Sequence, residues 1–222
     1  MKASPNASLK ILKHGVFFMK ILALSGSPRV NGNTDQYLNM VLEECAANGA
    51  ETELIRVCDL NIKGCRGCYG CVQAKACVHQ DDFQPVFAKI VEADVLLLGS
   101  PVYHSSISAE LKAVLDRTGF CGRWAVSEMK AKEGAYEFSA SVLSGKIAAP
   151  VTVARRAGHN FAFAQILLWA AANDCLIVNN TYWNVGVAGK GGAKDAAEDT
   201  EGVTTMKNLA QRILYVAGKM NS

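Results

Sequence analysis

The residues best suited to chemistry are four cysteines within a run of thirteen residues. Two residues separate Cys65 from Cys68 and Cys68 from Cys71, and five residues separate Cys71 from Cys77. Thiolates this close together can converge on one metal centre, and the intervening glycines relieve the strain of a tight wrap. A zinc ribbon instead places its two cysteine pairs about 15–20 residues apart. The spacing is close to the C-x2-C-x2-C-x3-C-P run of bacterial ferredoxins, but its last gap is longer and no proline follows. Iron–sulfur, zinc and unligated thiols all stay open.

A second candidate site is the polar run from Ser25 to Thr34, which leads directly into a predicted helix. Its small residues let backbone N–H groups approach an anion, and the helix N-terminus adds a favourable dipole. A Walker A loop is excluded because five residues separate Gly26 from Gly32 and Asn33 follows. A dinucleotide-binding glycine pattern is also absent. The run therefore predicts a phosphate site, and the alternative is a strand–helix turn that needs only glycine and a cap.

These runs fall within an alternation of strands and helices that begins at Met19. Hydrophobic periodicity predicts strands over 19–25, 53–58, 94–100, 147–153 and 175–180. Helices are expected over 33–48, from Pro85 to Glu92, and over 108–117, 160–172 and 204–220. We interpret 1–18 as an N-terminal arm outside the core, 119–145 as an irregular insertion and 182–202 as a long loop. The pattern predicts one α/β domain over 19–222 with a doubly wound parallel sheet.

Bulk composition narrows the function further. The chain has 222 residues and a formal net charge of +3. It shows no basic cluster with interleaved aromatics, which argues against nucleic-acid binding. It also has no apolar run of about 20 residues, so no membrane span is predicted. Clustered cysteines without a secretory signal favour a reducing, cytoplasmic location.

Three motifs together resemble the NADPH-dependent FMN reductase family of flavodoxin-like proteins. They are the Ser25–Thr34 run, the run Gly99-Ser100-Pro101-Val102-Tyr103, and the run from Ser108 to Arg117. The resemblance extends from about Met19 to Val185. It implies a flavodoxin-like, doubly wound, five-stranded parallel sheet of order 2-1-3-4-5, with helices on both faces. In such sheets ligands bind where the strand order reverses, here beside the first and third strands.

The resemblance also implies which residues contact FMN. The phosphate would be held by Ser25, Ser27, Arg29, Gly32, Asn33 and Thr34. The flavin ring would lie along Pro101, Val102, Tyr103, His104 and Ser106. The loop after the fourth strand would face the other side of the flavin through Arg155, Arg156 and Gly158. His104 is as well explained as an ordinary loop histidine, and both arginines as residues facing solvent or a neighbouring subunit.

The cysteine spacing, placed after the second strand, resembles that of the iron-sulfur flavoproteins in this group. The resemblance assigns Cys65, Cys68, Cys71 and Cys77 as ligands of a [4Fe-4S] cluster near the flavin. The other cysteines, Cys45, Cys58, Cys121 and Cys175, receive no role. No catalytic side chain is assigned, because the cofactor carries the chemistry.

The expected function is that of an FMN redox flavoprotein that passes electrons between a nicotinamide and a quinone or ferredoxin. A cluster-free FMN, quinone or nitroaromatic reductase is the alternative, and a non-enzymatic flavodoxin-type carrier is an alternative of another class. The long insertion and loop favour subunit contacts, so a homodimer or homotetramer is expected.

Overall fold

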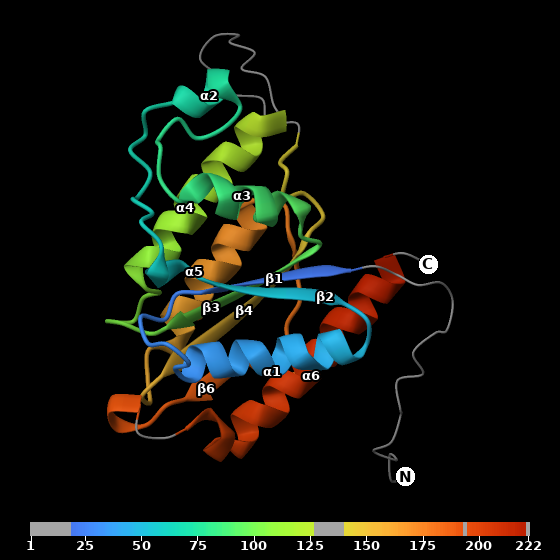
Figure 1. The fold of residues 1–222 in the computed structure, drawn as a ribbon. Helices are drawn as coiled ribbons and strands as arrows, with labels where there is room; N and C mark the ends of the chain where they lie inside the picture. Colours follow the sequence, from blue (N-terminus) through green and yellow to red (C-terminus); the bar gives the residue numbers. More distant parts are fainter. Residues whose placement is uncertain (1–18, 127–139, 193–194, 221–222) are drawn as a thin grey trace.

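The computed structural model describes residues 19–126, 140–192 and 195–220. Its centre is a parallel sheet in the order β2-β1-β3-β4-β5, with β6 also paired to β4 (Figure 1). The strands are β1 Lys20–Ser25, β2 Glu51–Arg56, β3 Val95–Pro101, β4 Ile147–Ala154, β5 Leu176–Ile177 and β6 Val185–Val187. The predicted fold class and strand order are therefore confirmed.

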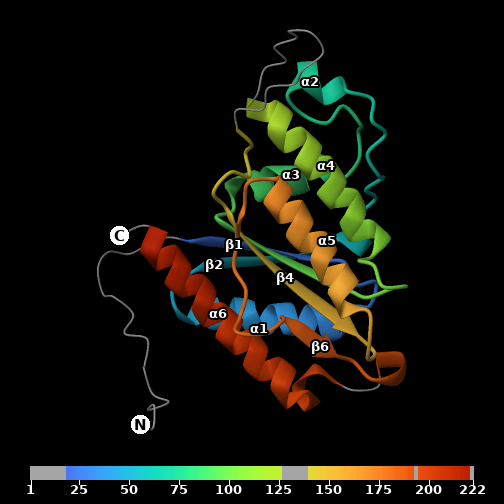
Figure 2. The same cartoon turned by 180° about the vertical axis from the view of Figure 1, so that it is seen from behind.

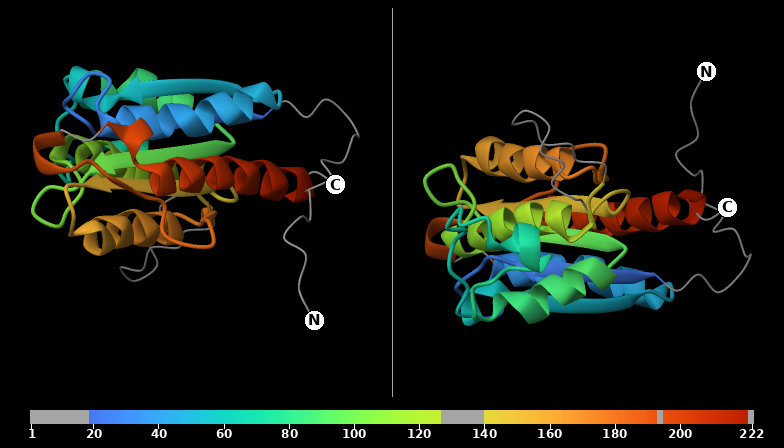
Figure 3. Two further views of the ribbon diagram at one scale, coloured as in Figure 1. Left: turned by 90° about the horizontal axis from the view of Figure 1, so that it is seen from below. Right: turned by 90° about the horizontal axis from the view of Figure 1, so that it is seen from above.

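Helices cover both faces of the sheet. One face carries α1 (Asn33–Ala47) and α6 (Thr200–Met220), and the other carries α3 (Phe83–Glu92), α4 (Ala109–Val126) and α5 (His159–Ala172). Seen from behind, the first group lies below the sheet and the second above it (Figure 2), so that α1 and α6 are in front in the view from below and α3, α4 and α5 in the view from above (Figure 3). A short helix, α2 (Gly70–Ala74), lies in the cysteine run, and short 3-10 turns span Val57–Asp59, Lys190–Gly192 and Ala196–Glu198.

Strand periodicity explains the two cores. In β1, Ile21 and Ala23 pack with the α1–α6 side, whereas Leu22 and Leu24 pack with the α3–α4–α5 side. All eight residues of β4 are buried, as expected for a central parallel strand covered on both faces. The carboxyl ends of the parallel strands consequently meet at one edge of the sheet, where their loops can form a site.

The predicted insertion over 119–145 is wrong at its start. Helix α4 continues through Gly119 and Gly122 to Val126, whereas residues 127–139 lie outside the described residues. A Cβ at Gly119 would lie 3.0 Å from Asn173 Oδ1, and one at Gly122 would lie 3.1 Å from Ser141 Oγ. These glycines therefore permit close packing of α4 and do not end it.

The fifth strand and the loop after it also differ from the prediction. Only Leu176–Ile177 pair with β4, and the predicted loop 182–202 contains β6, which pairs with β4 further along. Pro150 lies between the two pairings and has no N–H to donate to a ladder, and its carbonyl accepts a bond from Asn184 Nδ2 at 3.0 Å. The second strand begins and ends two residues earlier than predicted, and α6 begins at Thr200, earlier than the predicted 204.

The predicted arm over 1–18 lies outside the described residues. Within the described part of the chain, no helix has both the length and the apolar character needed to cross a membrane.

Candidate functional site

The loop after β1 folds tightly on itself. Ser27 is buried, and its Oγ accepts a bond from the Arg29 N–H at 3.2 Å, while its own N–H donates to Ser25 Oγ at 3.3 Å. Gly32 N–H then donates to the Arg29 carbonyl at 3.1 Å, and Gly32 is the N-cap of α1. Asn33 and Thr34, residue types that commonly cap helices, lie instead within the first turn. Because glycine has no side chain to cap the helix, the first turn of α1 is suited to a bound anion.

Glycine is required at two points of this loop by close approach. A Cβ at Gly26 would lie 2.4 Å from Ser108 Oγ and 2.9 Å from Leu111 Cβ, so the loop rests directly on the start of α4. A Cβ at Gly32 would lie 3.0 Å from Arg29 Cβ and 3.2 Å from Ser27 Oγ. The loop thus forms a cradle of backbone and small side chains, which fits a phosphate group.

A buried charged group lies beneath this cradle. Asp35, on the first turn of α1, accepts a hydrogen bond from Ser25 Oγ at 2.5 Å and forms an ion pair with Arg56. Arg56 also donates to the Arg29 carbonyl at 2.7 Å and to Asp59 at 2.8 Å. Hydrogen bonds to Asp59 and Asp35 raise the pKa of Arg56 above its ordinary value. Arg56 therefore balances Asp35, so that a second negative charge can bind above it.

The loop after β3 ends in a strained turn. Tyr103 and Ser106 exchange two backbone hydrogen bonds of 2.9 Å, and the residues between them, His104 and Ser105, have positive φ angles of 48° and 62°. Two positive φ angles define a type I′ turn, which is uncommon without glycine or asparagine and is often found at functional sites. Tyr103 is partly exposed; burial raises its pKa, and the charge of Arg29 lowers it, so the two loops share one electrostatic environment.

The loop after β4 contacts the turn from the other side. Gly158 has a φ of +91°, and a Cβ there would lie 3.0 Å from Val102 Cγ1 and 3.2 Å from Ser105 Oγ. Arg155 and Arg156 are both exposed. Three strand-end loops therefore lie at the same edge of the sheet and contact one another in series. The structure brings together the predicted phosphate and ring-binding residues, while their contacts with a cofactor stay predictions.

A fourth segment joins the phosphate loop. Arg29 is exposed, and its Nη1 donates to the Gly191 carbonyl at 2.9 Å. Gln36 Nε2 donates to the Asn31 carbonyl at 3.0 Å and lies 3.4 Å from Asp195 Oδ2. The chain after β6 is thus held against the loop after β1, and the exposed Arg29 lies at their junction.

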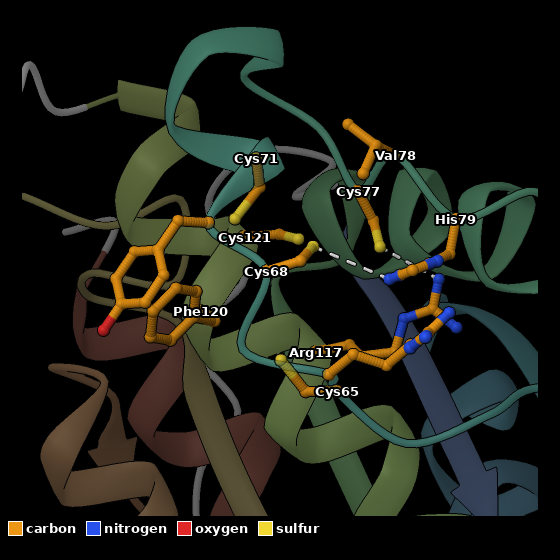
Figure 4. A pocket seen from close by; sticks show the side chains of 11 residues that line it. Cys65, Cys68, Cys71, Cys77, Val78, His79, Arg117, Phe120 and Cys121 are labelled. Carbon is orange, nitrogen blue, oxygen red and sulfur yellow. Dashed lines mark hydrogen bonds between the residues drawn. The ribbon is translucent and has the colours of Figure 1, made fainter.

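The cysteine run forms a separate pocket against the second half of α4. All four predicted ligands line this pocket, together with Cys121, Arg117 and His79 (Figure 4). Positive φ angles at Gly67 (60°), Tyr69 (56°) and Lys75 (57°) turn the backbone around it. Helix α2, which the sequence did not predict, carries Cys71 into the pocket.

The sulfur atoms differ in their surroundings. Cys65 and Cys68 are exposed, and Cys68 Sγ lies 3.6 Å from His79 Nε2. Cys71 and Cys121 are buried and contact each other, and burial raises the pKa of both thiols. Among the described residues, no three cysteine, histidine or carboxylate side chains lie at metal-coordinating separations. Four thiols that line one pocket nevertheless fit a thiolate-bound cluster in their chemistry, and binding would require the four side chains to converge.

Arg117 closes the inner wall of the pocket. It donates to Cys77 Sγ at 3.0 Å, to the Lys63 carbonyl at 3.1 Å and to Asp81 Oδ2 at 2.5 Å. Its guanidinium carbon lies 4.1 Å from the centre of the Phe83 ring. Burial alone would raise the pKa of Asp81, but hydrogen bonds from Arg117 and backbone N–H groups lower it below its ordinary value.

Helix α4 connects the two sites. Ser108 immediately precedes it, accepts a bond from the Leu111 N–H at 3.3 Å and lies against Gly26 of the phosphate loop. Cys121, further along α4, lines the cysteine pocket. The twelve steps along the helix from Ala109 to Cys121 rise by about 18 Å. The segment after β2 also connects the two sites, because it runs from the edge of the sheet where the strands end up to α2 (Figure 1).

Sequence reasoning missed five residues that build these sites: Asp35, Arg56, Asp81, Arg117 and Cys121. Asp81 and Asp82 precede α3, where acidic residues commonly cap a helix. Asp81 does accept a bond from the Phe83 N–H at 3.1 Å, but it also holds Arg117. Asp82 occupies the N-cap position of α3, although its side chain instead binds the Asn61 N–H at 2.7 Å. The arginine at the end of the Ser108–Arg117 motif was the one available signal for the buried pair.

Comparison with known proteins shows which chains this one is similar to. A family model described as NADPH-dependent FMN reductase matches residues 19–190. An iron-sulfur flavoprotein of Methanocaldococcus jannaschii is 32% identical over 89% of this chain and 97% of its own length. An iron-sulfur flavoprotein of Archaeoglobus fulgidus is 31% identical over 90% of this chain and 96% of its own.

Solved structures share the fold at lower identity. An NADH:FMN oxidoreductase in its apo form superposes with a TM-score of 0.61 at 18% identity, covering 89% of each chain. A flavodoxin, WrbA-like protein from Agrobacterium tumefaciens superposes with a TM-score of 0.58 at 14% identity, covering 90% of this chain and 98% of its own. At these identities the likeness establishes the fold alone.

Proposed function

Because the chain belongs to the NADPH-dependent FMN reductase family, and within it to the iron-sulfur flavoproteins, we propose that it carries a [4Fe-4S] cluster beside its flavin. The protein is an FMN-binding redox flavoprotein and an NAD(P)H-dependent flavin oxidoreductase. The observation that carries the proposal is that four closely spaced cysteines line one pocket on the helix whose start supports the phosphate loop.

In this proposal the loop after β1 holds the FMN phosphate. Ser27, Gly32, Asn33 and Thr34 lie where backbone and hydroxyl donors surround the start of α1, and Ser25 supports the loop from below. Arg29, which is exposed and donates to the Gly191 carbonyl, supplies a positive charge at the entrance. Arg56 neutralises Asp35, so the phosphate does not face an unpaired carboxylate. The site therefore needs little net charge of its own.

The flavin ring is placed along the type I′ turn. Pro101, Val102 and Tyr103 lead into that turn, and His104 and Ser106 complete it. The Gly158 loop packs on Val102 and Ser105, so Arg155 and Arg156 stand at the rim. A guanidinium there can stabilise negative charge on the pyrimidine end of the ring. A bound FMN would supply hydride-accepting and one-electron chemistry, which suits a nicotinamide donor and an iron–sulfur acceptor.

The cluster ligands are proposed to be Cys65, Cys68, Cys71 and Cys77. Two of them are exposed on the loop, which leaves the pocket open for assembly of iron and sulfide. The positive φ angles along the loop supply the tight turns that a compact cluster requires. Cys121 approaches from α4, outside this loop, and is not proposed as a ligand.

Anaerobic reconstitution with ferrous iron and sulfide tests this assignment. The wild-type chain should then show iron by elemental analysis and a broad visible shoulder beside the flavin bands. Single substitutions of the four cysteines by serine should reduce iron while leaving FMN bound. A wild-type protein without iron after this treatment would exclude the cluster and favour a cluster-free FMN, quinone or nitroaromatic reductase.

Anaerobic mixing with NADH or NADPH tests the enzyme against a plain electron carrier. Loss of the flavin absorbance is expected with one or both nucleotides. A nicotinamide donor and a quinone or ferredoxin acceptor are the partners proposed for this chain, acting as a homodimer or homotetramer. A flavin that neither nucleotide bleaches would instead favour a flavodoxin-type carrier.

A further inference from the structure

Arg117 places a fully buried positive charge directly beside one of the proposed cluster ligands. Its side chain is 1% exposed, and its Nη2 lies 3.0 Å from Cys77 Sγ. We propose that Arg117 is a positioning residue that raises the reduction potential of the cluster through Cys77. The inference rests on the proposed cluster and adds a function for a residue outside the ligand set.

The environment of Arg117 is costly for a purely structural residue. Desolvating an ion pair costs several kcal/mol per ion, and well-packed apolar residues of similar volume are often at least as stabilising. Its one carboxylate partner is Asp81, whose side chain is 7% exposed, and its Nε has no hydrogen-bond partner among the described residues. A buried charge that is incompletely paired and aimed at a sulfur atom indicates an electrostatic role.

The contacts of Arg117 also fix its orientation. Asp81 and the Lys63 carbonyl share Nη1, and the guanidinium lies over the Phe83 ring. Nη2 points to Cys77 (Figure 4). Lys63 lies just before the cysteine run and Cys77 is its last member, so Arg117 from α4 is hydrogen-bonded at both ends of the run. Arg117 therefore holds the loop closed and delivers its charge at a defined point.

The direction of the effect follows from charge. Reduction of the cluster adds one electron and makes the site more negative, so a nearby fixed positive charge favours the reduced form. Hydrogen bonds to cluster sulfurs and local net charge are established controls of cluster potentials. Removing the charge should shift the equilibrium at least tenfold toward the oxidised form. For a one-electron couple this lowers the reduction potential of the cluster by at least about 59 mV.

Redox titration of the anaerobically reconstituted full chain tests this inference, with dithionite as the reductant. Arg117→Gln should lower the cluster potential by at least that tenfold shift, and Arg117→Lys should retain most of the wild-type value. Asp81→Asn keeps the arginine and removes its counter-charge, so it should raise the potential. The exposed Arg212 on α6 supplies the matched control, because Arg212→Gln should leave the potential unchanged.

The outcomes separate this inference from the proposed function. A wild-type chain that takes up no iron would defeat the proposed cluster itself. If Arg117→Gln retains wild-type iron content and potential, the inference is overturned. If Arg117→Gln does not fold or bind iron, Asp81→Asn decides, and an unchanged or lowered potential in that variant overturns the inference. The flavin potential, recorded in the same titration, should stay constant in every variant.

Discussion

The contact between Gly26 and helix α4 makes Gly26→Ala the sharpest test of the phosphate loop. An alanine Cβ would lie 2.4 Å from Ser108 Oγ and 2.9 Å from Leu111 Cβ, which is far inside normal contact. Overpacking of this kind destabilises the folded state by about 1–3 kcal/mol. Alanine also lowers the conformational entropy of the unfolded chain, which stabilises the fold by about 0.4–1 kcal/mol. We therefore expect the free energy of unfolding to fall by about 1–2 kcal/mol.

The same clash should displace the loop from its ligand. Gly26 N–H donates to the Gly99 carbonyl at 2.8 Å, which ties the loop to β3, and Ser27 follows directly. If the loop must shift by more than a few tenths of an ångström, FMN affinity should fall by about tenfold, because 1.4 kcal/mol corresponds to that factor. Urea unfolding measures the first effect, and quenching of flavin fluorescence measures the second.

Two further variants make the test specific. Ser108→Ala removes the nearer clashing atom, so the double variant should lose less stability than the sum of the two single variants, by about 0.5 kcal/mol or more. Gly218→Ala is the control: Gly218 is exposed on α6, and no atom of the described residues lies near its Cβ position, so alanine there should stabilise by about 0.5–1 kcal/mol. Wild-type stability and FMN affinity in Gly26→Ala would refute the proposed role of this contact.

Three other predictions concern single groups. Arg29→Ala should weaken FMN binding by about tenfold, the value of one charge-assisted hydrogen bond, but leave riboflavin binding unchanged; equal losses for both ligands in a titration would contradict a phosphate contact. Cys77→Ser should lose iron by elemental analysis, whereas Cys121→Ala should keep it; iron loss from both would make Cys121 a ligand. Burial raises the pKa of Cys45 from 9 to about 12, so the unfolded thiol ionises first and stability falls as pH rises from 9 to 12. Between pH 9 and 12 the urea midpoint of Cys45→Ala should fall less steeply with pH than that of the wild type. Equal pH dependence in the two proteins would show that ionisation of Cys45 is not the cause.

Much of the fold could be predicted because its signals are local. The apolar runs that became β1, β3 and β4 are continuous and buried on both sides, and the small polar run after β1 leads directly into α1. The edge elements were harder to predict. Gly119 and Gly122 favoured an early end of α4, but both permit close packing against Asn173 and Ser141. Pro150 divides the pairing of β4 between two short strands, which no local pattern indicates.

The buried charges of the site depend on contacts between distant residues. Arg56 lies 21 residues from Asp35, and Arg117 lies 36 residues from Asp81. Nothing in the neighbouring sequence indicates these partners, since each ion pair forms only when the strands and helices have packed. The four proposed cysteine ligands could be found from the sequence because they lie within one short run, whereas Cys121 reaches the same pocket from α4.

Flavin and iron are proposed to occupy separate sites on the same chain. The most direct measurement is the FMN and iron content per chain after anaerobic reconstitution, made in parallel on wild type, Arg29→Ala and Cys77→Ser. Wild type should hold one FMN and four irons, as expected for a [4Fe-4S] flavoprotein; at limiting FMN, Arg29→Ala should lose flavin and keep iron, and Cys77→Ser should lose iron and keep flavin. Joint loss of both cofactors in each folded variant, or a wild-type chain without iron, would contradict the account.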